Sequence, residues 1–120
     1  MTATSTDYDP ATLPAPVLTY LDARDADRHA DAAAVFAPDA TVVDDGHTYG
    51  GVDAIGEWIG RSSTEFRYTS TRLGQRVEPH GADLRVRVDG DFPGGTVTLG
   101  YRFELAEGRI RHLTIAPVTA

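Results

Sequence analysis

The stretch APDATVVDDGHTYGG, residues 37–51, decides how the rest of the chain is arranged. Residues 41–43 are β-branched and favour a pleated strand. Asp45-Gly46 is typical of a two-residue hairpin turn, because such a turn needs residues that tolerate positive φ angles. Asp44 then lies where the strand meets the turn, and its carboxylate can point into a cavity that the fold encloses.

The residues on both sides of this stretch predict three helices. We expect them over about residues 14–24, 27–38 and 52–61. Asp27 is a favourable N-cap for the second helix, because a carboxylate there can accept a hydrogen bond from the first turn. Pro38 is expected to end that helix, since proline has no N–H to donate and clashes with the preceding turn.

From about residue 65 onward the sequence is typical of antiparallel strands. Alternation of apolar and polar residues predicts strands over about residues 65–78, 84–89, 96–103 and 109–117, with turns at 79–81, 92–95 and 107–108. Gly74 indicates a β-bulge within the first of them. Helices followed by strands indicate the α+β class. We expect one domain over residues 11–120, after a flexible segment at residues 1–10.

The composition argues against several classes of function. The chain has 120 residues, a formal net charge of −7 and no cysteine. An acidic chain repels phosphate, so nucleic acid is not an expected partner. The first residues lack the basic and apolar regions of a signal peptide, and no run approaches the ~18 apolar residues of a membrane span. A soluble, cytoplasmic protein that does not bind membranes is therefore expected.

Two motifs point to a known family. The first is Phe36-Ala37-Pro38-Asp39-Ala40-Thr41-Val42, and the second combines Tyr101-Arg102-Phe103 with Gly108-Arg109-Ile110. With the order of elements, they resemble the nuclear transport factor 2-like superfamily, which includes ketosteroid isomerases and SnoaL-like polyketide cyclases. The resemblance covers about residues 14–117. It implies a curved antiparallel sheet that wraps around a cone-shaped pocket and is closed by the helices.

The resemblance also implies an active site. Against the ketosteroid isomerases, Tyr20 matches the oxyanion-hole tyrosine and Asp44 matches the catalytic base, whereas Leu99 occupies the place of the second hydrogen-bond donor. Asp44 would remove a proton next to a carbonyl group, and Tyr20 would stabilise the enolate. Isomerisation, cyclisation or dehydration of an apolar, polyketide-like or steroid-like substrate would follow.

Further residues are candidates for the same pocket. His47 follows the turn closely, where it could shuttle a proton or orient Asp44, or simply be an exposed hairpin residue. The candidate substrate-binding residues are Trp58, Phe66, Leu99, Tyr101, Phe103 and Leu113. No metal site is expected, because Asp44, Asp45 and His47 match no dedicated ligand pattern. No cofactor is expected either.

Three alternatives stay open. Asp44 can be read as turn chemistry alone, because aspartate side chains bond to nearby backbone N–H groups. The chain can also be a non-catalytic module that binds an apolar ligand or a protein partner. Epoxide hydrolysis by an Asp–Arg–Asp arrangement is the third alternative, although alternation points Arg102 away from Tyr101 and Phe103. The resemblance further implies a homodimer that pairs sheet against sheet.

Overall fold

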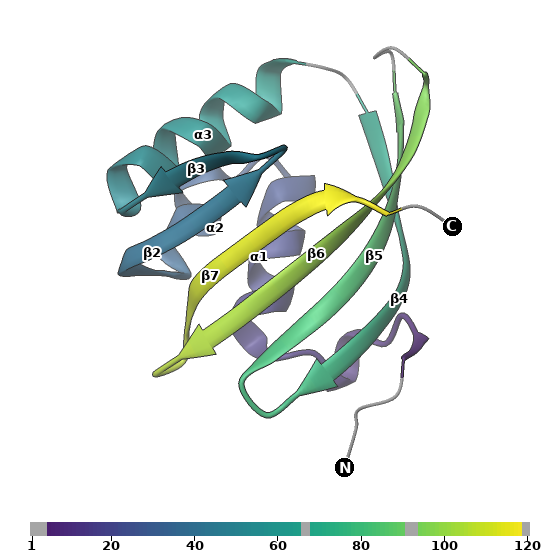
Figure 1. Ribbon diagram of the computed structural model, residues 1–120, viewed down its shortest axis with the longest axis horizontal. Coiled ribbons are helices and arrows are strands. Elements are labelled where there is room, and N and C mark those ends of the chain that lie inside the picture. The colour runs from purple at the N-terminus through teal and green to yellow at the C-terminus, as the bar shows by residue number, and fades with distance from the viewer. Residues whose placement is uncertain (1–4, 66–67, 91–93, 119–120) are drawn as a thin grey trace.

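A curved sheet wraps around three helices in the computed structural model, which describes residues 5–65, 68–90 and 94–118 (Figure 1). Within these ranges the helices are α1 (Ala15–Asp25), α2 (His29–Ala34) and α3 (Val52–Glu65), preceded by a 3₁₀ turn, η1 (Pro10–Thr12). The strands are β1 (Thr6–Asp7), β2 (Phe36–Asp44), β3 (His47–Gly50), β4 (Tyr68–Glu78), β5 (Gly81–Gly90), β6 (Thr96–Ala106) and β7 (Arg109–Pro117). This architecture confirms the α+β prediction.

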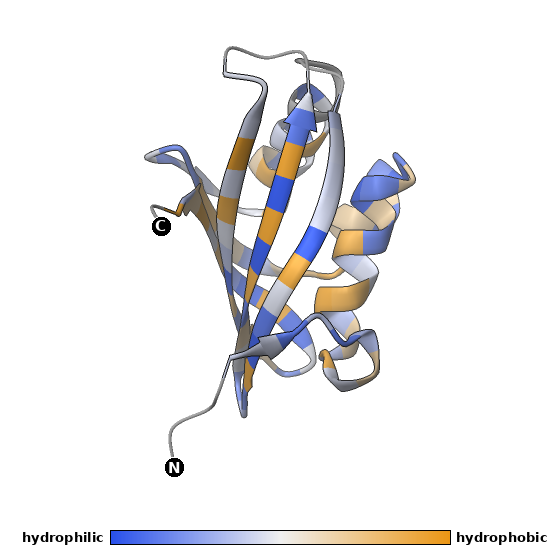
Figure 2. Cartoon of the chain, turned by 90° about the vertical axis from the view of Figure 1, so that its right-hand side faces the viewer, coloured by the Kyte–Doolittle hydropathy of each residue, from blue (hydrophilic) through white to orange (hydrophobic). Residues whose placement is uncertain are grey.

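The strands form one sheet in the order β1-β4-β5-β6-β7-β2-β3. Neighbouring strands are antiparallel, except that β2 runs parallel to β7. Along β5, apolar and charged residues alternate from Leu84 to Asp89, as Figure 2 shows. The apolar ones are buried and the arginines are exposed, so one face of the sheet packs on the helices and the other faces solvent.

The hairpin predicted at Asp45-Gly46 is confirmed. Asp44 pairs with His47 across the turn, and Asp45 and Gly46 have φ angles of 52° and 76°. Both turn residues therefore have the left-handed backbone that a two-residue hairpin with the sheet's twist requires. As a result, Asp44 is the last residue of β2.

The expected second helix was wrong at both ends. Asp27 has a φ of 56° and lies outside the helix, whereas Arg28 occupies the N-cap position without a side-chain cap hydrogen bond. Phe36 starts β2, pairs with Ile110 and packs its buried ring 5.5 Å from that of Tyr20. Pro38 lies in the irregular part of β2, between Phe36 and Thr41. Proline is tolerated at such irregularities, so Pro38 lies within a strand whose pairing with β7 is irregular there, and it does not end a helix.

The bulge predicted at Gly74 is confirmed by a register shift between Arg72 and Gly74. A Cβ added there would lie 2.9 Å from the Thr6 carbonyl oxygen, so the glycine allows β1 to approach β4. The buried Gln75 side chain accepts from Asp9 N at 2.9 Å and donates to Asp9 O at 3.0 Å. Part of the segment expected to be loose is thus bound to the sheet edge.

No helix among the described residues is long and apolar enough to cross a membrane. The core lies between the helices and the concave face of the sheet, and its largest fully buried side chains come from both layers. They include Tyr20, Phe103, Ile55, Ile59, Leu84, Ile110 and Leu113.

Candidate functional site

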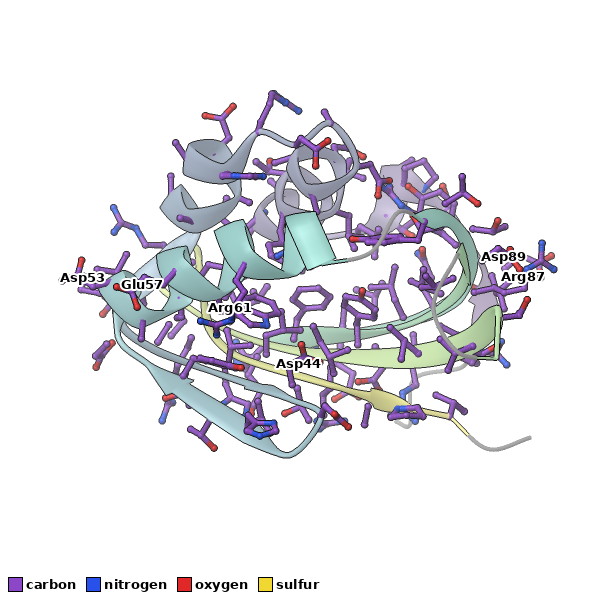
Figure 3. All side chains as sticks on the ribbon, turned by 90° about the horizontal axis from the view of Figure 1, so that it is seen from above. Asp44, Asp53, Glu57, Arg61, Arg87 and Asp89 are labelled. Atoms are coloured by element: carbon purple, nitrogen blue, oxygen red, sulfur yellow. The ribbon has the colours of Figure 1, made fainter. Side chains whose placement is uncertain are left out.

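A cavity of about 550 Å³ lies between α1, α3 and the concave face of the sheet. This volume is within the range typical of sites for small molecules. Figure 3 shows Asp44 on the inner side of the sheet beneath α3, whereas Asp53 and Glu57 of α3 point away. The cavity is lined by Tyr20, Leu21, Arg24, Asp25, Asp44, Asp45, Trp58, Tyr68, Ser70, Arg72, Val86, Val88, Val97, Leu99, Tyr101, Ile115, Ala116 and Pro117.

The Asp44 carboxylate is held in place by Trp58. The indole Nε1–H of Trp58 donates to Asp44 Oδ2 at 3.0 Å, from the inner face of α3 to the end of β2. Trp58 is only 3% exposed, and its ring lies 5.9 Å from that of Tyr49 in β3. The buried indole therefore orients one oxygen of the Asp44 carboxylate toward α3 at the cavity wall.

The Tyr20 side chain is buried beside the cavity. Its ring packs edge-on against Phe36 and against Phe103, at centroid distances of 5.5 and 5.8 Å. Burial raises the pKa of Tyr20 to about 12; the nearby Arg24 guanidinium opposes this shift, and the charge of Asp44 adds to it. Tyr20 therefore keeps its proton near neutral pH and can donate a hydrogen bond.

Arg24 is a cavity residue that the sequence interpretation missed. It follows Tyr20 by one helical turn in α1, and its guanidinium carbon lies 5.0 Å from the Trp58 ring centroid. Burial lowers the pKa of Arg24, but the phenols of Tyr20, Tyr68 and Tyr101 outweigh this effect and raise it above its usual value. The cavity thus contains a permanent cation close to Tyr20. The i, i+4 spacing from Tyr20 was the signal that could have revealed it.

The structure brings together part of the expected set. Trp58, Leu99 and Tyr101 line the cavity, whereas Phe103 and Leu113 are fully buried and outside its lining. Phe66 lies outside the described residues.

His47 is exposed and does not line the cavity; its Nδ1 lies 3.1 Å from the Asp45 carbonyl oxygen. His47 is directly opposite Asp44 in the hairpin, but it lies at the exposed start of β3, the edge strand of the sheet. Arg102 is likewise exposed, and it pairs with Asp83 at 3.3 Å on the other face of the sheet. An epoxide hydrolase site that uses Arg102 is therefore wrong for this cavity.

A second group of polar residues lies at the side of the cavity formed by β4, where Ser70, Arg72 and Asp25 line it. Arg72 donates to Asp22 and Asp25 of α1, both at 2.9 Å, and to the hydroxyl of Tyr8 at 2.6 Å. Ser70 donates to the other oxygen of Asp25 at 3.0 Å. The sequence gives no local signal for this group, because the bonds join residues 45 to 64 positions apart.

The two buried cavity tyrosines predict a loss of stability at alkaline pH. Burial raises the pKa of Tyr20 to about 12, and it raises that of Tyr101 further, against about 10 in an unfolded chain. The unfolded state therefore loses these protons first. The free energy of unfolding should fall as pH rises above 10, by up to about 1.4 kcal/mol per pH unit for each tyrosine.

Urea unfolding followed by circular dichroism between pH 9 and pH 11.5 measures this slope. Tyr20→Phe should make the slope of unfolding free energy against pH shallower by up to about 1.4 kcal/mol per pH unit, the contribution of one proton. An unchanged slope in Tyr20→Phe would show that this phenol is not retained in its protonated form by the fold.

The curved sheet, the covering helices and the internal cavity define a protein of the nuclear transport factor 2-like fold class. The chain belongs to the SnoaL-like domain family, whose model matches residues 14–113. No curated protein sequence matches it.

Several solved structures are similar to this one. A Sinorhizobium meliloti protein, named as a candidate polyketide cyclase, shares 36% identity with a TM-score of 0.86, over 91% of this chain and 100% of its own. A Sphaerobacter thermophilus protein shares 24% identity over 88% of this chain and 94% of its own, with a TM-score of 0.75. A Catenulispora acidiphila protein with a ketosteroid isomerase-like fold shares 19% over 88% of this chain and 86% of its own, with a TM-score of 0.76.

Proposed function

We propose that this protein is an enzyme that removes a proton from a carbon next to a carbonyl group of an apolar small molecule. The observation that supports this best is the position of Asp44. Its carboxylate is oriented by Trp58 and lines the same cavity as the buried, protonated Tyr20. A base and a hydrogen-bond donor in one apolar cavity are the two groups that enolisation requires.

In the proposed reaction, Asp44 takes the proton and the C–H electron pair moves toward the carbonyl, so that negative charge develops on oxygen. The Tyr20 hydroxyl donates to this oxygen, and the Arg24 guanidinium supplies positive charge nearby. Such groups stabilise a developing oxyanion strongly in a site that excludes water. Arg24 can thereby compensate for the absence of a donor at Leu99.

The fate of the enolate determines the class of enzyme. Return of the proton to another carbon gives isomerisation, and attack of the enolate carbon on a second carbonyl gives cyclisation. Loss of a hydroxyl group from the neighbouring carbon gives dehydration. The likeness to the Sinorhizobium meliloti candidate polyketide cyclase favours cyclisation.

Deuterium exchange tests this proposal without knowledge of the natural substrate. In D₂O, the protein should accelerate replacement of the α-protons of an apolar bicyclic ketone such as 1-tetralone, followed by NMR. Exchange at the buffer rate with 1-tetralone and with estrone, in spite of saturable binding, would contradict the proposed chemistry.

That contradictory result would support a second candidate, a module that binds an apolar ligand without reacting. The observation that favours it is the cavity wall itself, where Val86, Val97 and Leu99 offer no hydrogen-bond donor. Binding and exchange, measured on the same ketones, separate the two candidates.

We also propose that the chain forms a homodimer through the convex face of the sheet. Arg85, Arg87 and Arg102 are exposed there. Val118 is 41% exposed and lies over Gly100, which alternates with the inward-facing Leu99 and Tyr101. A face of mixed apolar and polar character suits a self-complementary interface.

Light scattering at micromolar concentration should therefore give twice the chain mass of 12.9 kDa. Val118→Asp should weaken the dimer because it places a charge in the interface, whereas Val52→Asp on α3, 42% exposed, should not. A monomer mass for the unmodified protein would refute this proposal.

A further inference from the structure

The cavity has polar groups at two separate ends. Asp44 and Trp58 form one end, on β2 and α3, and Ser70, Arg72 and Asp25 form the other, on β4 and the last turn of α1. In the sheet, β4 and β2 are separated by β5, β6 and β7. These intervening strands supply an apolar wall that includes Val86, Val88, Val97, Leu99 and Ile115.

The end formed by β4 combines one cation with two carboxylates. Arg72, with only 12% of its side chain exposed, donates to Asp22 and Asp25. Its guanidinium also donates to the Tyr8 hydroxyl and lies over the Tyr8 ring, with a distance of 5.3 Å to the centroid. Both carboxylates are thus occupied by Arg72 at this end, while the other cation of the cavity, Arg24, lies against the Trp58 ring.

The hydrogen-bonding capacity of this end determines which group it can recognise. Ser70 gives its only proton to Asp25 Oδ1, so the Ser70 oxygen can only accept a further hydrogen bond. Each Asp25 oxygen already accepts one bond and has lone-pair capacity for more. The Ser70–Asp25 pair therefore offers acceptors toward the cavity and suits a neutral donor.

We propose that Ser70 and Asp25 form a second binding subsite, which recognises a hydroxyl group at the end of the substrate remote from the reacting carbonyl. A cavity of about 550 Å³ can hold a ring system that reaches from Asp44 toward β4. This inference rests on the proposed function for the carbonyl at Asp44, whereas the hydroxyl preference at Ser70 and Asp25 is measured by binding alone. It assigns the substrate to hydroxylated cyclic ketones.

A purely structural role is the competing explanation, because the Arg72 ion pairs also tie α1 to β4. Ser70 distinguishes the two explanations. Its removal leaves the Arg72 bonds to Asp22, Asp25 and Tyr8 in place, so the attachment of α1 should survive. Loss of the hydroxyl preference in Ser70→Ala would therefore report recognition and not the attachment of the helix.

Two matched pairs of ketones test the subsite, and they differ in the distance between the carbonyl and the hydroxyl group. The pairs are 6-hydroxy-1-tetralone with 6-methoxy-1-tetralone, and estrone with its 3-methyl ether. Each methoxy compound keeps the shape and the carbonyl but cannot donate. Binding can be followed by the fluorescence of Trp58, because the chain has a single tryptophan and it lines the cavity. In at least one pair, the hydroxyl compound should bind about 10- to 100-fold more tightly, as expected for a bond to a charged acceptor.

Ser70→Ala should remove most of this preference, and Thr71→Ala should retain it. Thr71 is the matched control, since it is the next residue of β4 and is exposed outside the cavity lining. Equal affinities within both pairs, a preference that survives Ser70→Ala, or no saturable binding of any of the four ketones would each overturn the subsite.

The preference should persist in Asp44→Asn, because the two ends of the cavity bind different groups. This variant separates the two proposals. A hydroxyl preference without deuterium exchange in the unmodified protein would leave the subsite standing and refute only the enolisation. Deuterium exchange without a hydroxyl preference would leave the enolisation standing and refute only the subsite.

Discussion

Asp44→Asn is expected to lower the rate of α-proton exchange by roughly 10²–10⁴-fold, the usual contribution of a general base. Asparagine has nearly the same shape, and its amide oxygen can still accept from Trp58 Nε1, which lies 3.0 Å from Asp44 Oδ2. It cannot accept the substrate proton near neutral pH. Affinity for the ketones should change little, so the loss should fall on the rate constant and not on binding.

Asp45→Asn is the matched control. Asp45 also lines the cavity, but it is exposed and occupies the turn with a φ of 52°. Asparagine tolerates this left-handed backbone well, so stability and exchange rate should both stay near those of the unmodified protein. If a well-folded Asp44→Asn variant keeps an exchange rate within about twofold of the unmodified protein, Asp44 only stabilises the turn and the proposed mechanism is wrong.

Tyr20→Phe is expected to lower the exchange rate by roughly 10²-fold, which corresponds to the removal of one oxyanion donor. The substitution keeps the ring that packs against Phe36 and Phe103 at 5.5 and 5.8 Å, so the core should remain filled. Arg24 still supplies positive charge to the cavity. The exchange rate should therefore fall less in Tyr20→Phe than the upper limit of roughly 10⁴-fold expected for Asp44→Asn.

The pH profile gives a second measurement on the same residue. Because burial raises the pKa of Tyr20 to about 12, the donor should remain protonated and the exchange rate should not fall between pH 8 and pH 10.5. Tyr49→Phe is the control, since the Tyr49 ring packs on Trp58 but does not line the cavity. Equal rates in Tyr20→Phe and Tyr49→Phe would remove Tyr20 from the mechanism.

Local signals predicted much of the fold. The turn at Asp45-Gly46, the alternation along β5 and the bulge at Gly74 are all present in the structure. Each depends on the backbone preferences of a few neighbouring residues or on a period of two, which the sequence contains directly. The motif at residues 36–42 also identified the family correctly.

Boundaries that depend on distant residues were predicted poorly. Phe36 was expected in a helix, but pairing with Ile110 and packing on Tyr20 place it in β2. Likewise, residues 6–9 have no strong local preference, and it is the buried Gln75 side chain that binds this segment to β4. In both cases a tertiary contact outweighed the local propensity.

By itself, the sequence determined the hairpin that places Asp44 at the end of a strand, because turn chemistry is local. Only the tertiary structure decided that Trp58, 14 residues away, donates to this carboxylate, and that Ser70 meets Asp25 across 45 residues. It also decided that His47 stays outside the cavity while Arg24 enters it. These outcomes depend on how the helices pack on the curved sheet, and no short stretch of the chain contains that information.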